Sequence, residues 1–160
     1  MRNNEKEIPR HQPPKGSKTQ NQELLYDPNV LTPSHAEQAQ TLVSKMATAT
    51  LCTMSIEPAG YPYGSFVTYA IYEGNPIFLI SGLAEHTKNL DKDSKASLLI
   101  AEAGEGNPLA LGRVTLMGDC KRLPEEHREN VRDIFLSKNP DSKFYIDFKD
   151  FYFYRLEVSE

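Results

Sequence analysis

The stretch that decides the fold is PIFLISGLAEHTKNLDKDSKASLLIAEA, residues 76–103. Ile77–Ile80 is a continuous apolar run that stops at Ser81, as in a buried strand that enters a turn. Apolar residues then recur at helical spacing as far as Leu90, and residues 96–101 are apolar again. The stretch therefore predicts a buried strand, a short helix and a second buried strand.

The junction between this strand and this helix is a candidate phosphate site. The first turn of a helix offers unpaired backbone N–H groups and a partial positive charge, and both favour an anion. Four side chains add hydroxyl, imidazole and ammonium donors there: Ser81, His86, Thr87 and Lys88. We predict that these side chains bind a phosphate group. The alternative that stays open is a solvent-exposed helix start whose polar residues only cap the helix.

The rest of the chain adds strands and helices around this stretch. A capping box formed by Ser34 and Glu37, followed by apolar residues at spacings of three and four up to Ala47, predicts a helix of about four turns. A second helix should begin at Pro124 and end at Asn139. Runs with a period of two, or with continuous apolar character, predict six strands: residues 49–56, 63–72, 77–80, 96–101, 113–123 and 151–158.

This order of elements has no alternating βαβα rhythm, so the sheet should be antiparallel. Closing such a sheet removes its exposed edges. The predicted fold class is mainly β with short flanking α-helices, in a six-stranded antiparallel barrel. Residues 1–22 contain three prolines and only one branched aliphatic residue, Ile8, and cannot bury enough apolar surface to fold. We therefore predict a disordered N-terminal arm over residues 1–22 and a single domain over residues 23–160.

Composition excludes several classes of protein. The chain has 160 residues and a formal net charge of −4 without a basic stripe, which argues against nucleic-acid binding. No stretch reaches the roughly 20 apolar residues of a membrane span, and the N-terminus has no signal-peptide core. Cys52 and Cys120 each lie in an expected strand without a C-x-x-C pair, which favours buried thiols in a reducing compartment. We expect a cytoplasmic protein that binds neither nucleic acid nor a membrane.

Few residues are candidates for catalysis. Paired carboxylates at catalytic spacing and an H-x-x-x-H motif are both absent, which argues against a hydrolase or a metalloenzyme, and we assign no catalytic residue and no metal site. His11, His35 and His127 are expected at the surface. Arg113 opens the polar face of the strand 113–123, where it either contacts a ligand or an interface, or pairs with a surface carboxylate.

Five segments together resemble the split-barrel flavin-binding family related to pyridoxamine 5′-phosphate oxidase, and most of all its haem-utilisation, HugZ-like branch. They are, in chain order, GYPYGSFVTYA, LISGLAEHTKNL, KASLLIAE, PLALGRVTLMGD and DFKDFYFYRLE. The resemblance covers residues 33–158. It implies a six-stranded split barrel of the FMN-binding type, and a homodimer with two flavin mononucleotide (FMN) sites at the subunit interface.

The resemblance also implies which residues contact the cofactor. They are Ser65, Val67, Thr68, Ser81, His86, Thr87, Lys88 and, from the partner chain, Arg113. Ser65 stands where the oxidase has an arginine, and Ala70 stands where it has a lysine. The charge-assisted bonds of these two cations to a phosphate are therefore absent.

The main functional expectation is an FMN-binding protein with a small-molecule ligand. The resemblance implies flavin-dependent oxidoreductase chemistry. The first alternative is a haem-binding or haem-degrading HugZ-like protein. In haem-degrading members the axial histidine comes from a C-terminal tail after a V-x-G-F-G segment, whereas this sequence stops at Glu160 before either. His86 is then the best-placed histidine within the fold. The second alternative is a cofactor-free barrel that binds other proteins.

Overall fold

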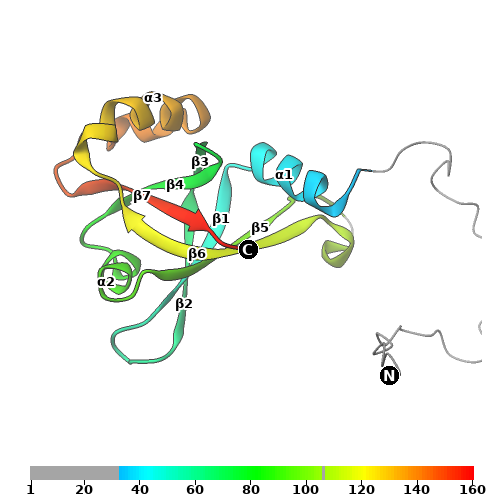
Figure 1. Ribbon diagram of the computed structural model, residues 1–160, viewed down its shortest axis with the longest axis horizontal. Coiled ribbons are helices and arrows are strands. Elements are labelled where there is room, and N and C mark those ends of the chain that lie inside the picture. The colour runs from blue at the N-terminus through cyan, green and yellow to red at the C-terminus, as the bar shows by residue number, and fades with distance from the viewer. Residues whose placement is uncertain (1–32, 106) are drawn as a thin grey trace, which may run out of the picture. The chain divides into compact units, whose positions relative to one another are not determined.

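A computed structural model describes residues 33–105 and 107–160 (Figure 1). The predicted arm, residues 1–22, and His11 lie outside the described residues. The helices and strands are α1 (His35–Lys45), β1 (Thr48–Met54), β2 (Pro62–Thr68), β3 (Ala70–Tyr72), β4 (Asn75–Ser81), α2 (Glu85–Lys92), β5 (Lys95–Ala101), β6 (Arg113–Arg122), α3 (Arg128–Lys138) and β7 (Phe151–Val158). Short 3-10 turns are η1 (Pro108–Ala110), η2 (Glu125–His127) and η3 (Pro140–Phe144).

The strands form one antiparallel sheet in the order β2-β1-β5-β6-β7-β4-β3. β2 and β3 stand at the two ends of this order, although only Tyr69 separates them in the chain. A sheet whose two edge strands are joined by one residue must curl until its edges approach each other. The predicted fold class, a mainly β antiparallel split barrel with short helices, is confirmed.

The predicted number of strands is wrong, because the described residues form seven rather than six. The expected strand 63–72 divides at Tyr69 into β2 and β3. The backbone N–H of Tyr69 donates to Ala47 O at 2.9 Å, and its carbonyl accepts a bond from the Asn139 side chain at 3.0 Å. Both backbone groups of Tyr69 are thus bound outside the sheet ladder, and the chain passes from one sheet edge to the other at this residue.

The core of the described part of the chain consists of two clusters of buried residues. The first lies inside the curl of the sheet and includes Leu51, Phe78 and Leu98. The second packs α3 onto the sheet through Val131 and Phe135. Figure 1 shows α3 beside β3, with α2 at a different side of the sheet. The α2 helix packs against β1, with Leu90 in the first cluster. Its first turn lies just after the end of β4.

One of the two predicted helix starts is confirmed and the other is wrong. Ser34 Oγ accepts from the Glu37 backbone N–H at 3.2 Å, and the Glu37 carboxylate accepts from the Ser34 N–H at 2.7 Å, so the capping box is confirmed. The helix expected from Pro124 begins only at Arg128, because residues 125–127 form the tighter turn η2. Among the described residues, no helix has the length and apolar character needed to cross a membrane.

The two cysteines are free thiols in different surroundings. Cys120 is buried as predicted, and burial raises the pKa of its thiol to about 12. The prediction is wrong for Cys52, which is only half-buried. Cys52 lies on the outer face of β1, opposite Gly64 of β2, and a glycine offers no side chain to cover it.

Candidate functional site

A cleft of about 360 Å³ opens between β2, β4, the start of α2 and the beginning of β7. Its lining is mostly aliphatic and aromatic: Phe66, Val67, Thr68, Leu79, Ile80, Ser81, Ala84, His86, Tyr145 and Phe151. We call it the β2–β4 cleft. Four of the residues predicted to bind a cofactor line it, namely Val67, Thr68, Ser81 and His86, and Ser65 contacts His86 beside it.

A histidine, His86, lines this cleft. Its Nδ1 lies 3.0 Å from the hydroxyl oxygen of Ser65, and its Nε2 is buried without a hydrogen-bond partner among the described residues. Burial lowers the pKa of His86 from its ordinary value, so the imidazole is neutral at neutral pH. A neutral ring keeps a lone pair on one nitrogen, which a metal ion or a donor group can use.

The elbow between β4 and α2, residues 81–88, is tied together by its own donors. Ser81 Oγ donates to Asp150 Oδ2 at 2.8 Å and accepts from the Leu83 N–H at 3.1 Å. Thr87 Oγ1 donates to the Ser81 carbonyl at 2.6 Å. Three of the four side chains predicted to surround a phosphate, Ser81, Thr87 and His86, therefore already have a partner within the chain.

Lys88, the fourth, is exposed at the surface and pairs with Glu85 at 2.6 Å. Such an exposed pair contributes little to stability. Ala84 is the N-cap of α2, and its methyl side chain cannot accept a hydrogen bond from the backbone N–H groups of the first turn. The role of these residues in phosphate binding stays a prediction.

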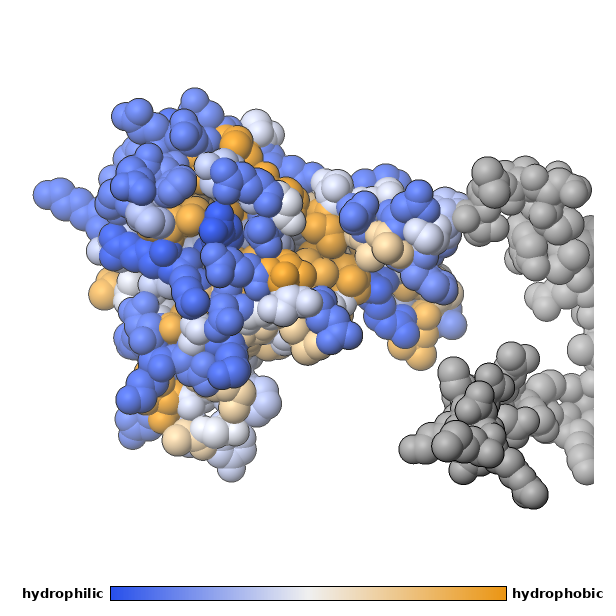
Figure 2. Space-filling view, in the orientation of Figure 1, coloured by the Kyte–Doolittle hydropathy of each residue, from blue (hydrophilic) through white to orange (hydrophobic). Residues whose placement is uncertain are grey.

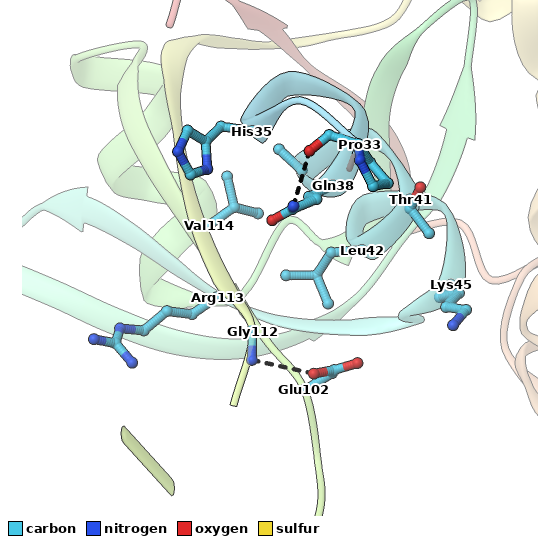
Figure 3. Close-up of a pocket in the computed structure, with 11 residues that line it drawn as sticks. Pro33, His35, Gln38, Thr41, Leu42, Lys45, Glu102, Gly112, Arg113 and Val114 are labelled. Carbon is cyan, nitrogen blue, oxygen red and sulfur yellow. Dashed lines mark hydrogen bonds between the residues drawn. The ribbon is translucent and has the colours of Figure 1, made fainter. Parts of the chain in front are cut away.

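Arg113 lies away from this cleft of its own chain. It lines a second cavity of about 600 Å³ between α1 and the ends of β5 and β6, together with His35, Lys45 and Glu102 (Figure 3). Its Nη1 donates to the Leu109 carbonyl at 3.1 Å. Figure 2 shows apolar side chains at the surface beside α1, in the same region. The contribution of Arg113 to a partner chain's site stays a prediction.

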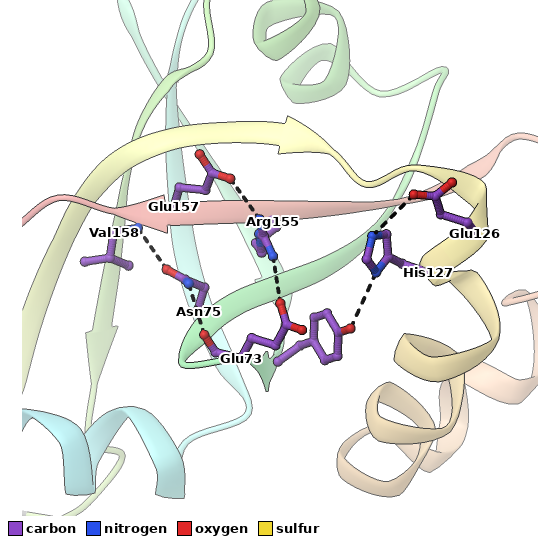
Figure 4. A network of polar contacts seen from close by, with 8 residues as sticks. Glu73, Asn75, Glu126, His127, Arg155, Glu157 and Val158 are labelled. Carbon is purple, nitrogen blue, oxygen red and sulfur yellow. Dashed lines mark hydrogen bonds and ion pairs between the residues drawn. The ribbon is translucent and has the colours of Figure 1, made fainter.

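The other two described histidines lie apart from the cleft. His35 is exposed at the start of α1. His127 is half-buried, with Nδ1 3.5 Å from the Tyr72 hydroxyl and Nε2 3.8 Å from Glu126 (Figure 4). The described part of the chain brings no three metal-type side chains together.

Sequence reasoning missed the aromatic residues of the site and one carboxylate beside it. Phe66, Tyr145 and Phe151 form aromatic walls, and Asp150 binds the elbow. The alternation of β2 does show that Phe66 points away from its buried neighbour Val67. The other three come from a segment that reaches the elbow only through the pairing of β4 with β7, where Ser81 stands opposite Phe151.

This architecture matches a known domain family. The family described as CREG, beta-barrel matches residues 31–160. The chain belongs to the CREG beta-barrel family. Within it, the finer assignment to the FMN-binding relatives of pyridoxamine 5′-phosphate oxidase stays a prediction.

Two relatives of this CREG-type barrel are named for haem. The non-canonical haem oxygenase HOZ, a chloroplastic protein of Arabidopsis thaliana, is 39% identical over 125 residues, which are 78% of this chain and 38% of the relative. A solved structure described as a haem-binding protein from Mycobacterium smegmatis is 38% identical with a TM-score of 0.73, over 81% of this chain and 53% of that chain. This chain thus spans about half or less of the length of these two relatives.

A third protein shows the fold alone. The structure described as the haem storage protein HutZ from Vibrio cholerae is 17% identical with a TM-score of 0.60, over 76% of this chain and 87% of that chain. The plant and mycobacterial relatives are named for haem and not for FMN. They favour the haem alternative over the flavin expectation.

Proposed function

We propose that this protein binds haem in the β2–β4 cleft. The observation that carries the proposal is an imidazole, His86, in the wall of an apolar and aromatic cleft, with one ring nitrogen unpartnered among the described residues. The naming of two relatives for haem supports it. Haem degradation, as in the name of the plant relative, would be a further step beyond binding.

The lining fits the chemistry of a haem. Flat aromatic and branched aliphatic side chains such as Phe66, Phe151 and Ile80 suit the apolar faces of a porphyrin. His86 would hold the iron through Nε2, while its Nδ1 contact with Ser65 orients the ring, as the second nitrogen does in metal-ligating histidines. Nε2 is covered in this structure, so the side chains over it must move aside for a haem iron to reach it. When bound, the haem would supply iron-centred redox and oxygen chemistry.

A second copy of the chain is part of the proposal. The outer face of β2, β1, β5 and β6 carries Phe66, Leu99 and Met117, which are 78%, 41% and 46% exposed. Phe66 and Leu99 both stand beside Thr50 of β1, so the face is continuous across neighbouring strands. Phe66 also lines the cleft. A partner that covers this face would therefore also border the bound cofactor, as the family resemblance implies.

Haemin titration of the full chain, followed by visible absorption, tests the proposal. We expect saturable binding with one sharp Soret band. His86→Ala should weaken binding at least about tenfold and change the band, because the iron loses its ligand. The matched control is His35→Ala, an exposed histidine of the second cavity, which should behave as the wild type.

Two results would contradict the proposal in different ways. A wild-type chain that shows no saturable haemin binding would remove the function. Haemin binding that is unchanged in His86→Ala would place the haem outside the β2–β4 cleft. Uptake of FMN with twin flavin bands, and no uptake of haemin, would support the flavin expectation instead.

A further inference from the structure

We propose that Asp150, beside the β2–β4 cleft, is a specificity-determining residue, because its carboxylate holds the Ser81 hydroxyl that a cofactor phosphate would otherwise use. The inference rests on the proposed function only in taking this cleft as a cofactor cleft. It assigns the cleft to ligands without a phosphate, and it means that the phosphate of a ligand such as FMN adds no affinity.

The hydrogen bonds of the elbow carry the inference. Asp150 Oδ2 accepts the Ser81 hydroxyl at 2.8 Å, and the same hydroxyl oxygen accepts the Leu83 N–H at 3.1 Å. The backbone carbonyl of Asp150 accepts the Gly82 N–H at 2.6 Å. A phosphate could take the Ser81 or Gly82 donor only by displacing Asp150, which leads directly into β7.

The remaining charge around the elbow is also unfavourable to an anion. Lys88 is the one cation among the four predicted phosphate contacts, and it is exposed and paired with Glu85. Glu85 itself lies in the first turn of α2. A carboxylate near a helix N-terminus satisfies the positive end of the helix dipole. Asp150 and Glu85 thus supply from within the chain the negative charge that a phosphate would otherwise bring.

The sequences of β2 and β3 fit this arrangement. Ser65 of β2 and Ala70 of β3 carry a hydroxyl and a methyl group, so neither side chain offers a positive charge to a phosphate. Ser65 contacts His86 instead of an anion. A haem does not need the elbow, because apolar walls and an iron ligand can hold it.

The test compares two flavins that differ only in the phosphate. FMN and riboflavin are titrated by fluorescence quenching into the full apo chain, and the affinity ratio of FMN to riboflavin is measured. We expect the wild type to bind FMN no more tightly than riboflavin. Asp150→Asn keeps an acceptor for Ser81 and removes the charge, so the ratio should rise at least about fivefold, the scale of removing one nearby like charge.

The control for net charge is Asp141→Asn, an exposed carboxylate of η3, which should leave the ratio unchanged. A wild type that binds FMN several times more tightly than riboflavin would overturn the inference. An affinity ratio of FMN to riboflavin that rises less than fivefold in Asp150→Asn would overturn it too. The same holds if the Asp150→Asn variant does not bind FMN. If that variant does not fold, Asp150→Ser replaces it. In the wild type, FMN affinity should also not fall with added salt, whereas a phosphate held by cations would be weakened.

The haemin titration stays separate from this test. Failure of haemin binding with the expected flavin ratios would remove the proposed function and leave the role of Asp150 intact. Haemin binding by a wild type that prefers FMN to riboflavin would support the proposed function and remove the role of Asp150.

Discussion

The hydroxyl oxygen of Ser65 in β2 lies 3.0 Å from Nδ1 of His86 in α2. This contact spans 21 positions of sequence. It joins β2, at one edge of the sheet, to α2, which follows β4 near the other edge. It fixes the imidazole through one nitrogen and leaves the other for a ligand.

Ser65→Ala should weaken haemin binding by about tenfold without abolishing it, because the orienting contact of a metal-ligating histidine is worth about that much. Ser65→Thr keeps the hydroxyl and should restore the wild-type affinity and Soret position. Haemin titration with visible spectra checks both variants. Equal affinities of all three proteins would show that the Ser65 contact does not orient the ligand.

The stability of the protein should depend on pH through His86. Burial lowers the pKa of His86 in the folded chain, so the unfolded chain binds the proton more readily. The stability from burying the neutral ring is then fully present above the ordinary pKa of about 6.5 and is lost as the pH falls toward the lower folded value. Urea unfolding at pH 5 and pH 7.5 should therefore show a smaller pH difference in His86→Gln than in the wild type. His35→Gln, at an exposed site, should keep the wild-type difference.

Local patterns in the sequence predict most elements, and long-range pairing explains the misses. The capping box of Ser34 and Glu37 spans three positions and is readable directly. Residues 63–72 keep one alternation throughout, so nothing in them marks the break at Tyr69, which the distant Ala47 and Asn139 produce.

The site follows the same rule. Its β4–α2 half lies within one stretch of sequence, and four of the residues predicted there and in β2 line one cleft. Asp150 reaches Ser81 across 69 positions, and only the register between β4 and β7 brings them together. Sequence spacing contains no information on that register, since hairpins fix register locally and this pair is not a hairpin.

Gly118 in β6 should tolerate no side chain. A Cβ at this position would clash with the Glu157 carbonyl oxygen of β7, a backbone atom that cannot move without separating the two strands. Gly118→Ala should lower the free energy of unfolding by about 3 kcal/mol or more, or prevent folding. Gly64→Ala is the control, because its Cβ would meet the Thr50 side chain at an ordinary 3.5 Å. Urea unfolding of both variants measures the difference, and equal stabilities would contradict the prediction.

Asn89 should stabilise the packing of α2 on β1 through its buried side-chain amide. Its Nδ2 donates to Thr53 Oγ1 at 3.0 Å and its Oδ1 accepts the Ile56 N–H at 3.1 Å. Asn89→Leu leaves both groups without a partner and should cost about 2–4 kcal/mol of unfolding free energy. Adding Thr53→Val should recover part of this loss, because one orphaned polar group is removed. A double variant no more stable than Asn89→Leu would show that the Thr53 contact contributes nothing.

Charges on the outer sheet face should separate the proposed homodimer. Leu99→Glu combined with Met117→Glu places two carboxylates on the outer face of β5 and β6, where a partner chain would remove them from water. Light scattering should then give the mass of one chain for this variant and of two chains for the wild type. Ile134→Glu, on α3 at 37% exposure, controls for an apolar-to-acidic change elsewhere on the surface and should leave a dimer. A monomeric wild type, or a charged variant that stays dimeric, would mean that this face does not join two chains, and the cleft would then have to bind its cofactor within one chain.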